Sequence, residues 1–191
     1  GHQDILHVGH LVHGNDRSYA LVNVLLLEGE RRVLVFVATR AAAASLSERL
    51  SALGFPAQSL SGDLAQSQRT ATMEALRNGI VRVLVATDVA ARGLDVPDVA
   101  TVVHGDLPMD AEAYTHRSGR TGRAGKKGRS GTLATPRSIQ RARRILADAG
   151  VELDWQPVPS AEQVRRARAG RLRKELTELV TTLEPDDHAQ Q

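Results

Sequence analysis

Three arginines recur at every third position in the stretch from Tyr114 to Gly125, which reads YTHRSGRTGRAG. If this stretch begins as a turn of helix, residues three apart share a face, so Arg120 and Arg123 present their guanidinium groups in the same direction. A guanidinium is a planar, permanently charged fork that suits phosphate oxygens, and the interspersed glycines let a phosphate approach the backbone. The pattern therefore indicates phosphate recognition. The alternative is a basic, glycine-rich surface loop.

A second stretch with the chemistry of nucleotide contacts runs from Thr87 to Pro97 and reads TDVAARGLDVP. Thr87 offers a hydroxyl and a backbone amide, both suited to a nucleic-acid phosphate. Gly93 permits a close backbone approach, and the carboxylate of Asp95 can accept hydrogen bonds from a ribose hydroxyl. Taken alone, Asp88 and Asp95 are typical turn and capping residues.

The stretch from Ser61 to Arg69, SGDLAQSQR, leads from a turn into a predicted helix. A helix N-terminus exposes backbone amides and the positive end of the helix dipole, so it is a natural phosphate site. Gln66 and Arg69 lie on one side of the first turn, where they would brace that phosphate.

The elements that must position these stretches alternate between apolar strands and helices. Such alternation predicts a parallel sheet with helices on both faces, with functional groups at the carboxyl ends of the strands. Thr39, Gly62, Thr87 and Asp88 all follow predicted strand ends. After an extended lead-in within residues 1–15, strands are expected at 32–38, 57–60, 81–86, 100–104 and 129–134. Helices are expected at about 17–27, 40–53, 66–77, 111–117 and 136–148. Asp16 or Ser18 would cap the first helix, and Pro136 would lie in the first turn of the last.

Four segments together resemble the motifs of the DEAD-box RNA helicases. The H-R-x-G-R-x-G-R pattern ending at Arg123 is similar to motif VI, residues 87–97 to motif V, and residues 33–40 to motif IV. Residues 61–69 resemble the Gly-Asp and Q-x-x-R segment, although the family usually has His where this chain has Ser61. The resemblance covers about residues 5–150 and implies the second RecA-like domain of a bacterial-type ATP-dependent RNA helicase.

The resemblance also implies roles for individual residues. The implied catalytic residues are Arg120 and Arg123, which reach the γ-phosphate of ATP, and His116. Gly93 and Asp95 face the nucleotide. His116 and Arg117 meet the first domain, and related helicase groups that accept other nucleotides tend to carry Gln in place of this histidine. The residues implied to contact RNA are Thr39, Gly62, Gln66, Arg69, Thr87 and Asp88.

Two motifs of a complete helicase are absent from the sequence. It contains no G-x-x-x-x-G-K-[ST] phosphate loop and no Asp-Glu-Ala-Asp stretch. ATP with its Mg²⁺ is therefore expected to be held mainly by a first RecA-like domain outside this chain, and the chain alone is expected to be inactive. Two rival interpretations are a non-catalytic RNA-binding or dimerisation module that retains the fold, and half of a DNA-directed helicase.

Composition limits the remaining classes. The 191 residues include 41% hydrophobic residues and no cysteine, which excludes disulfides and thiolate metal sites. No apolar run approaches the length of a membrane span and no signal peptide is evident, so we expect a cytoplasmic protein without a membrane partner. The opening Gly-His suggests a tag remnant on an excised fragment. A metal site at His2, His7, His10 and His13 is the less favoured alternative to a lead-in strand, since no carboxylate completes a ligand set.

Residues 151–191 are expected to form a C-terminal extension to the RecA-like domain of residues 1–150. It comprises a short strand within 151–155, a helix opened by the capping box Ser160–Gln163 and running to about Leu183, and a frayed end at 184–191. The helix carries six basic residues in its first half and an apolar stripe: Leu172, Leu176, Leu179, Val180 and Leu183. Burial of this stripe against the domain itself is favoured, and a homodimer through the extension is the alternative.

Overall fold

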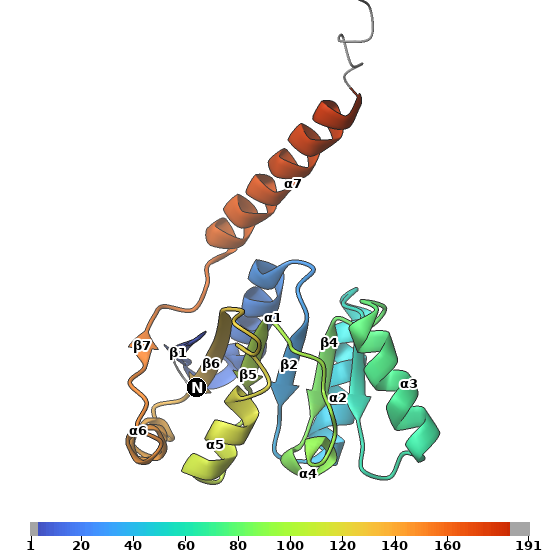
Figure 1. The fold of residues 1–191 in the computed structure, drawn as a ribbon. Coiled ribbons are helices and arrows are strands. Elements are labelled where there is room, and N and C mark those ends of the chain that lie inside the picture. The colour runs from blue at the N-terminus through green and yellow to red at the C-terminus, as the bar shows by residue number, and fades with distance from the viewer. Residues whose placement is uncertain (1–3, 184–191) are drawn as a thin grey trace, which may run out of the picture.

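Seven parallel strands make one sheet in the computed structural model, which describes residues 4–183 (Figure 1). Their spatial order is β3-β4-β2-β5-β6-β1-β7. The strands are β1 (Ile5–Leu11), β2 (Val33–Phe36), β3 (Ala57–Leu60), β4 (Val83–Ala86), β5 (Thr101–His104), β6 (Gly128–Ala134) and β7 (Asp154–Trp155). The boundary expected at residue 150 therefore precedes an edge strand of the same sheet.

Helices cover both faces of this sheet, as the sequence predicts. They are α1 (Arg17–Glu28), α2 (Arg40–Ala52), α3 (Gln66–Arg77), α4 (Asp88–Ala91), α5 (Ala111–Ser118), α6 (Ile139–Asp148) and α7 (Ala161–Leu183), with a 3₁₀ turn, η2 (Gly14–Asp16), before α1. Asp16 occupies the N-cap position of α1, but its side chain makes no capping hydrogen bond. The capping role expected of Asp16 is therefore wrong, and Ser18 lies inside the helix.

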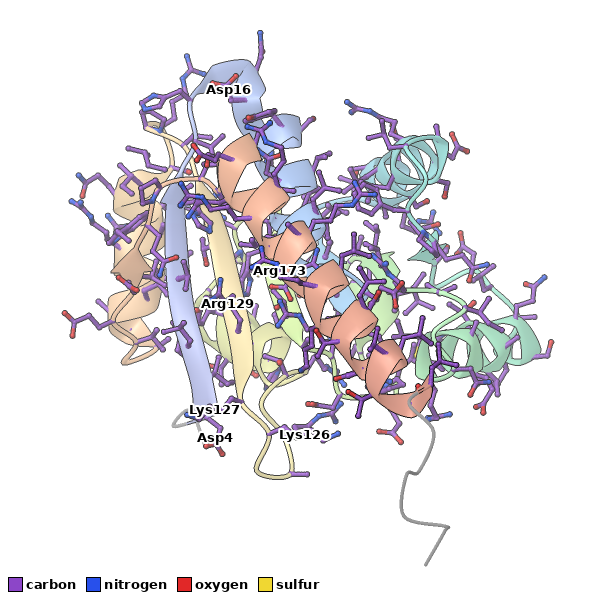
Figure 2. The ribbon with its side chains drawn as sticks, turned by 90° about the horizontal axis from the view of Figure 1, so that it is seen from above. Asp4, Asp16, Lys126, Lys127, Arg129 and Arg173 are labelled. Atoms are coloured by element: carbon purple, nitrogen blue, oxygen red, sulfur yellow. The ribbon has the colours of Figure 1, made fainter. Side chains whose placement is uncertain are left out.

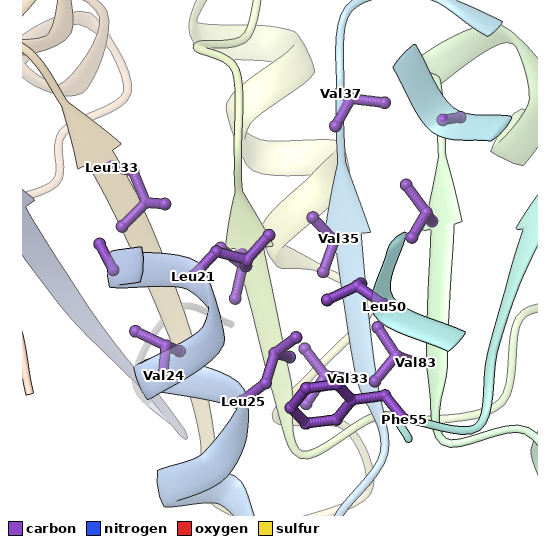
Figure 3. Close-up of a cluster of buried hydrophobic side chains, with 14 of the residues drawn as sticks. Leu21, Val24, Leu25, Val33, Val35, Val37, Leu50, Phe55, Val83 and Leu133 are labelled. Atoms are coloured by element: carbon purple, nitrogen blue, oxygen red, sulfur yellow. The ribbon is translucent and has the colours of Figure 1, made fainter. Parts of the chain in front are cut away.

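Strand β2 shows why the central strands are apolar throughout. Val33 and Val35 pack with Leu21 and Leu25 of α1 and with α2 on one face of the sheet (Figure 3). The alternate residues Leu34 and Phe36 pack on the other face, with α3 and α4. Successive side chains of a strand point to opposite faces, so a strand covered on both sides must be apolar at every position.

Helix α6 begins later than expected. Pro136 lies in a turn before the helix, and the turn is closed by the Thr135 amide, which donates to the Ser138 hydroxyl at 2.9 Å. Ser138 takes the N-cap position, and the helix starts at Ile139. The φ angle that proline fixes suits both a tight turn and the first turn of a helix. A proline alone therefore does not tell the two structures apart.

The histidines of the lead-in strand have partners within the protein. The Nδ1 atom of His7 lies 2.7 Å from the Tyr114 hydroxyl, and Nδ1 of His10 lies 3.0 Å from the carbonyl oxygen of Gln156. Burial lowers the pKa of His10, against hydrogen bonds to the backbone at Gln156 and Pro157. His13 is exposed, and His2 lies outside the described residues. Residues 4–183 contain no group of three or more His, Asp or Glu side chains placed to hold a metal ion.

The C-terminal helix α7 rises away from the body of the domain (Figure 1). Its expected capping box forms, since the Ser160 amide donates to the Gln163 side chain at 2.9 Å and the Gln163 amide donates to the Ser160 hydroxyl at 3.1 Å. Val164 is the buried residue of α7, and the Arg171 guanidinium donates to the carbonyl oxygens of Leu26 and Leu27 in α1.

The apolar stripe of α7 remains exposed, with side chains 52–72% accessible. The expectation that this stripe packs against its own domain is therefore wrong: the hydrogen bonds between α7 and α1 come from Arg171, and the stripe beyond it stays accessible. The frayed end expected at 184–191 lies outside the described residues. No helix within residues 4–183 combines the length and apolar character needed to cross a membrane.

Candidate nucleotide and RNA site

The residues expected to do chemistry gather at the carboxyl edge of the sheet, where neighbouring strands β3, β4 and β2 end. Thr39 follows β2 and caps α2, its hydroxyl accepting from the Ala42 amide at 3.1 Å. Thr87 follows β4 and caps α4, accepting from the Ala90 amide at 3.3 Å. A hydroxyl that accepts one hydrogen bond can still donate one, so each threonine keeps a donor for a phosphate oxygen.

The turn between β3 and α3 presents Gly62 and Gln66 to solvent. An exposed ion pair between Arg40 and Asp63 joins this turn to the start of α2. Arg69 is fixed differently, because its Nη2 donates to the carbonyl oxygen of Ala90 in α4 at 3.0 Å. Its Nε is buried and has no hydrogen-bond partner among the described residues. Arg69 therefore ties α3 to α4 beside Thr87 and retains an unused donor.

Arg117 is the most buried charged residue of the site. Its side chain is 3% exposed, and it donates from Nε and Nη2 to the two carboxylate oxygens of Asp88, at 2.7 and 2.8 Å. Nη1 donates to the carbonyl oxygen of Asp106 at 2.8 Å, and the guanidinium lies 5.0 Å from the centroid of the Phe36 ring. These contacts commit the guanidinium of Arg117 to groups of this domain and hold Asp88 in an ion pair, while the expected interdomain role of Arg117 and RNA contact of Asp88 stay predictions.

Arg120 and Arg123 lie beyond the end of α5, so the helical face expected for them does not exist. Both nevertheless reach the same segment, residues 91–98. Arg120 donates to the carbonyl oxygens of Leu94 at 2.9 Å and Ala91 at 3.3 Å. Partial burial, followed by the nearby charge of Arg123, lowers the pKa of Arg120, and Asp95 opposes the shift. Arg120 stays protonated at neutral pH, since an arginine starts so far above that range.

Arg123 is held by the same segment through Asp98 and Val96. Its backbone amide donates to Asp98 Oδ1 at 3.2 Å, its Nε lies 3.5 Å from the same oxygen, and its Nη2 donates to the Val96 carbonyl oxygen. Each arginine thus uses part of its set of five N–H donors on fixed acceptors, which leaves other donors for a ligand.

A hollow of about 490 Å³ lies between the 91–98 segment and α5. Gly93 lines it with the backbone at φ 73°, a conformation that glycine adopts without strain, and Arg120 and the exposed His116 line the opposite side. Asp95 is exposed next to the hollow, and Arg123 does not line it. Of the residues expected to face nucleotide, Gly93 and Arg120 therefore line one hollow, together with His116, which was expected to be catalytic and to meet the first domain.

A buried polar cluster supports α5 from beneath. His104 stacks on the Tyr114 ring at a centroid distance of 4.7 Å, and its Nε2 lies 2.9 Å from the Ser130 hydroxyl. Ser118 Oγ lies 2.8 Å from the same hydroxyl. Burial, aided by the charges of Arg117 and His7, holds the pKa of His104 well below its ordinary value, so His104 is neutral at physiological pH. The cluster joins α5 to β5 and β6.

Sequence reasoning missed two acidic residues that hold this site together. Asp106 accepts from the Ala38 amide at 2.7 Å, pairs with Arg17 and offers its carbonyl oxygen to Arg117. Asp98 fixes Arg123. The position of Asp106 in the sequence could have identified it, because it comes two residues after β5, at the carboxyl edge of the sheet. No such signal exists for Asp98, because its partner is 25 residues away along the chain.

The chain is similar in sequence to known helicases. The model of the helicase conserved C-terminal domain matches residues 17–125. The ATP-dependent RNA helicase DeaD of Mycobacterium tuberculosis is 41% identical over 158 residues, which cover 83% of this chain. The chain spans 28% of the length of that relative.

Solved structures extend the likeness to the fold. The C-terminal domain of the DEAD-box protein Dbp5 superposes with a TM-score of 0.77 at 29% identity, over 87% of this chain and 97% of that one. Dbp5 of S. cerevisiae bound to RNA and ADP BeF3 matches with a TM-score of 0.75 at 29% identity, over 86% of this chain and 45% of that one. The RecA-like class expected from the sequence is therefore confirmed.

Proposed function

Since the chain belongs to the helicase C-terminal domain family, in its DEAD-box RNA helicase branch, we propose that it is the half of the enzyme that completes the ATP site and grips RNA. ATP and its Mg²⁺ would be held mainly by a first RecA-like domain, with which His116 makes contact. The bound Mg²⁺ would neutralise phosphate charge. This domain would act in the cytoplasm, on single-stranded RNA.

The convergence of Gly93, His116 and Arg120 on one hollow carries the proposal for ATP. Hydrolysis of a γ-phosphate develops charge on its oxygens, and a fixed arginine that meets this charge stabilises the transition state. Arg120 is held by two backbone carbonyls, and Arg123 by Asp98 and Val96, so neither guanidinium has to be ordered during the reaction. Gly93 and Asp95 would contact the nucleotide between the domains.

Three adjacent loops at the carboxyl edge support the proposal for RNA. Thr39, Gly62 and Thr87 follow neighbouring strands, and α3 begins beside them with Gln66 exposed. Arg69 retains a buried donor next to Thr87. Backbone amides, hydroxyls and a guanidinium in a row contact phosphates and not base edges, so binding would be independent of sequence. Closure of both domains on ATP would bend the gripped strand and exclude its partner strand.

ATP hydrolysis by two lengths of protein tests this proposal. The 191-residue chain alone is expected to hydrolyse no ATP above background, while a longer protein that also carries the first domain hydrolyses ATP when RNA is added. In the longer protein Arg120→Ala and Arg123→Ala are each expected to lower the rate by about 10³–10⁵, as for other arginine fingers, with RNA affinity in the absence of nucleotide unchanged. RNA-stimulated turnover by the chain alone would refute the division of labour, and loss of RNA affinity in either variant would refute the finger assignment.

A homodimer through α7 is the second candidate function, favoured by the exposed apolar stripe that ends in Leu183. Three turns of exposed leucine and valine on a helix that leaves the domain are unusual for a monomer. The dimer would add a second RNA-binding domain without replacing the ATP-dependent role.

A further inference from the structure

A second hollow of the domain lies away from the carboxyl edge, at the amino ends of the strands. It measures about 420 Å³ and lies among the loops that lead into β2, β4, β5 and β6. Figure 2 shows two of its residues, Lys126 and Lys127, on the loop directly before β6. Its lining contains five basic and two acidic side chains: Arg31, Arg32, Arg77, Lys126, Lys127, Glu30 and Asp98.

Part of this positive charge is already compensated. Arg31 pairs with the buried Glu28 at 3.1 Å, and Arg77 pairs with Glu74 at 2.5 Å. Asp98 is engaged by Arg123, so it does not neutralise the lysines.

Three basic side chains remain without a carboxylate in ion-pair distance among residues 4–183: Arg32, Lys126 and Lys127. Glu30 lines the hollow as an exposed carboxylate, and Asp4 is exposed near the same loop (Figure 2). Unpaired basic charge on one concave surface is an electrostatic footprint for a polyanion.

The lining also lacks what a protein partner would need. Besides its charged side chains it consists of Asn78, Gly79 and Ala100, with no large apolar side chain. Protein interfaces depend on aromatic or aliphatic anchors in desolvated pockets, whereas nucleic-acid backbones are bound by Lys, Arg, polar side chains and amides. The composition of the hollow therefore favours phosphodiester backbone over an acidic protein.

The hollow adjoins a larger groove, of about 1000 Å³, that lies between α7 and the rest of the domain. The two share Glu30 and Arg31 in their linings, and the groove adds Arg82, Arg168 and Arg171. Glu175 and the paired Glu28 are its other acidic lining residues. The groove also has apolar lining residues, among them Leu53, Phe55 and Leu172, so the absence of large apolar side chains is a property of the smaller hollow. A lone anion would occupy one point of this track, whereas a polymer with regularly spaced phosphates would follow it.

We propose that this track is a second RNA-binding surface, which binds phosphodiester backbone away from the proposed RNA contacts at the carboxyl edge of the sheet. It runs from Lys126 and Lys127 past Arg32 to the first half of α7. The inference rests on the proposed function in that RNA is the partner, but it does not require the carboxyl-edge contacts to exist. This surface is connected to one of the two arginines implied to reach ATP. Asp98 lines the hollow and fixes Arg123, and the Lys126 amide donates to the Arg123 carbonyl oxygen at 3.1 Å.

Binding of fluorescent single-stranded oligouridine RNA to the purified chain, measured over a range of salt concentrations, tests the proposal. The double variant Lys126→Gln/Lys127→Gln is expected to bind more weakly and to reduce the salt slope by about 1.4, because each lost phosphate contact on a single strand removes about 0.7. The matched control is Arg143→Gln/Arg144→Gln, which removes the same charge from exposed positions on α6 and is expected to leave the slope unchanged. Unchanged circular dichroism of both variants confirms that each is folded.

Further measurements distinguish a failure of this proposal from a failure of the proposed function on which it rests. If Arg69→Ala weakens binding and the lysine variant behaves as the α6 control does, the second surface is wrong and the carboxyl-edge grip stands. If the lysine variant weakens binding and Arg69→Ala does not, the carboxyl-edge grip is wrong instead. Displacement of the RNA by poly-glutamate at equal charge concentration would show that acidic chains bind equally well, and it would overturn the assignment to RNA. Backbone amide signals of Lys126 and Lys127 are expected to shift when the RNA is titrated, and shifts confined to Gly62 and Thr87 would contradict the proposal.

Discussion

The guanidinium of Arg117 and the carboxylate of Asp88 form a two-pronged ion pair that joins α5 to the start of α4. Arg117 is 3% exposed, whereas Asp88 is 36% exposed. The carboxylate of Asp88 therefore lies on the solvent side of the buried guanidinium. The pair fixes the motif-bearing helix α5 to the loop that follows β4. These two elements form opposite sides of the candidate ATP hollow, so the ion pair sets its width.

Removal of Asp88 is therefore expected to affect the stability of the domain. Asp88→Ala leaves a buried guanidinium without its counter-charge, which costs about 3 kcal/mol of unfolding free energy. Urea unfolding followed by circular dichroism measures this loss. Asp63→Ala is the control, because it breaks an ion pair whose two side chains are 60% and 74% exposed and is expected to cost less than about 1 kcal/mol. Equal losses in the two variants would show that the buried pair has no special structural role.

Arg69 provides a prediction about RNA. Arg69→Ala is expected to weaken binding of every RNA sequence to a similar degree and to reduce the slope of log affinity against log salt by about one unit. The reason is that its side chain lies among loops that present amides and hydroxyls, and such groups contact phosphates. Gln58→Ala, which changes an exposed side chain on β3, is a suitable control. Sequence-selective loss of binding would contradict a backbone grip.

Two kinds of sequence signal account for the success of the fold prediction. The bounds of β3 and α3 agree with expectation because turn residues mark their ends: Gly54 and Pro56 precede β3, and Asn78 and Gly79 follow α3. Continuous apolar runs identify β2 and β4 as strands buried on both faces. Parallel pairing then places Thr39, Gly62 and Thr87 at one edge without any knowledge of side-chain contacts.

Long-range contacts explain most of what sequence reasoning missed. The periodicity of Arg120 and Arg123 indicated a helix, yet α5 ends at Ser118 and distant carbonyl groups hold both guanidiniums. Gly9 shows the same limit in the core. A Cβ atom there would lie 2.8 Å from the side chains of Leu153 and Trp155, so the parallel pairing of β7 with β1 favours glycine at this position. No local pattern reveals either relationship.

Acid is expected to destabilise the folded domain through His104. Its folded pKa lies well below the ordinary 6.5 because of burial and the charges of Arg117 and His7, whereas the unfolded chain takes up a proton near 6.5. The unfolded state therefore binds more protons below that pH, and stability, fully present above pH 6.5, falls as the pH drops from 6.5 toward the folded pKa. One such group contributes at most about 1.4 kcal/mol per pH unit.

The variant His104→Phe isolates this contribution because it keeps an aromatic ring beside Tyr114 and removes the titrating group. Unfolding free energy would be measured in urea above and below pH 6.5. The variant is expected to lose less stability on acidification than the natural chain, although the lowered pKa of His10 leaves part of the pH dependence in both. A loss of equal size in the two proteins would assign the acid sensitivity to other residues.

The stripe on α7 predicts self-association of the chain. Leu176 and Leu179 are 52% and 55% exposed, on a helix whose buried residue is Val164, near its start. The basic first half of α7 argues against a parallel pair, since like charges would face one another. An antiparallel pair instead sets that half against Glu175 and Glu178 of the second copy and covers both stripes at once. Sedimentation at several protein concentrations measures the association.

We expect a dimer that Leu176→Asp and Leu179→Asp each dissociate, because a carboxylate in a buried apolar seam lacks a partner. Thr181→Asp, which places the same charge elsewhere on the second half of the helix, serves as the control and is expected to retain the dimer. High salt gives a further distinction between the two arrangements. It should weaken an antiparallel dimer, whose opposite charges attract, and strengthen a parallel one, whose basic halves repel. A chain that stays monomeric at every concentration would show that the stripe is covered by something other than a second copy.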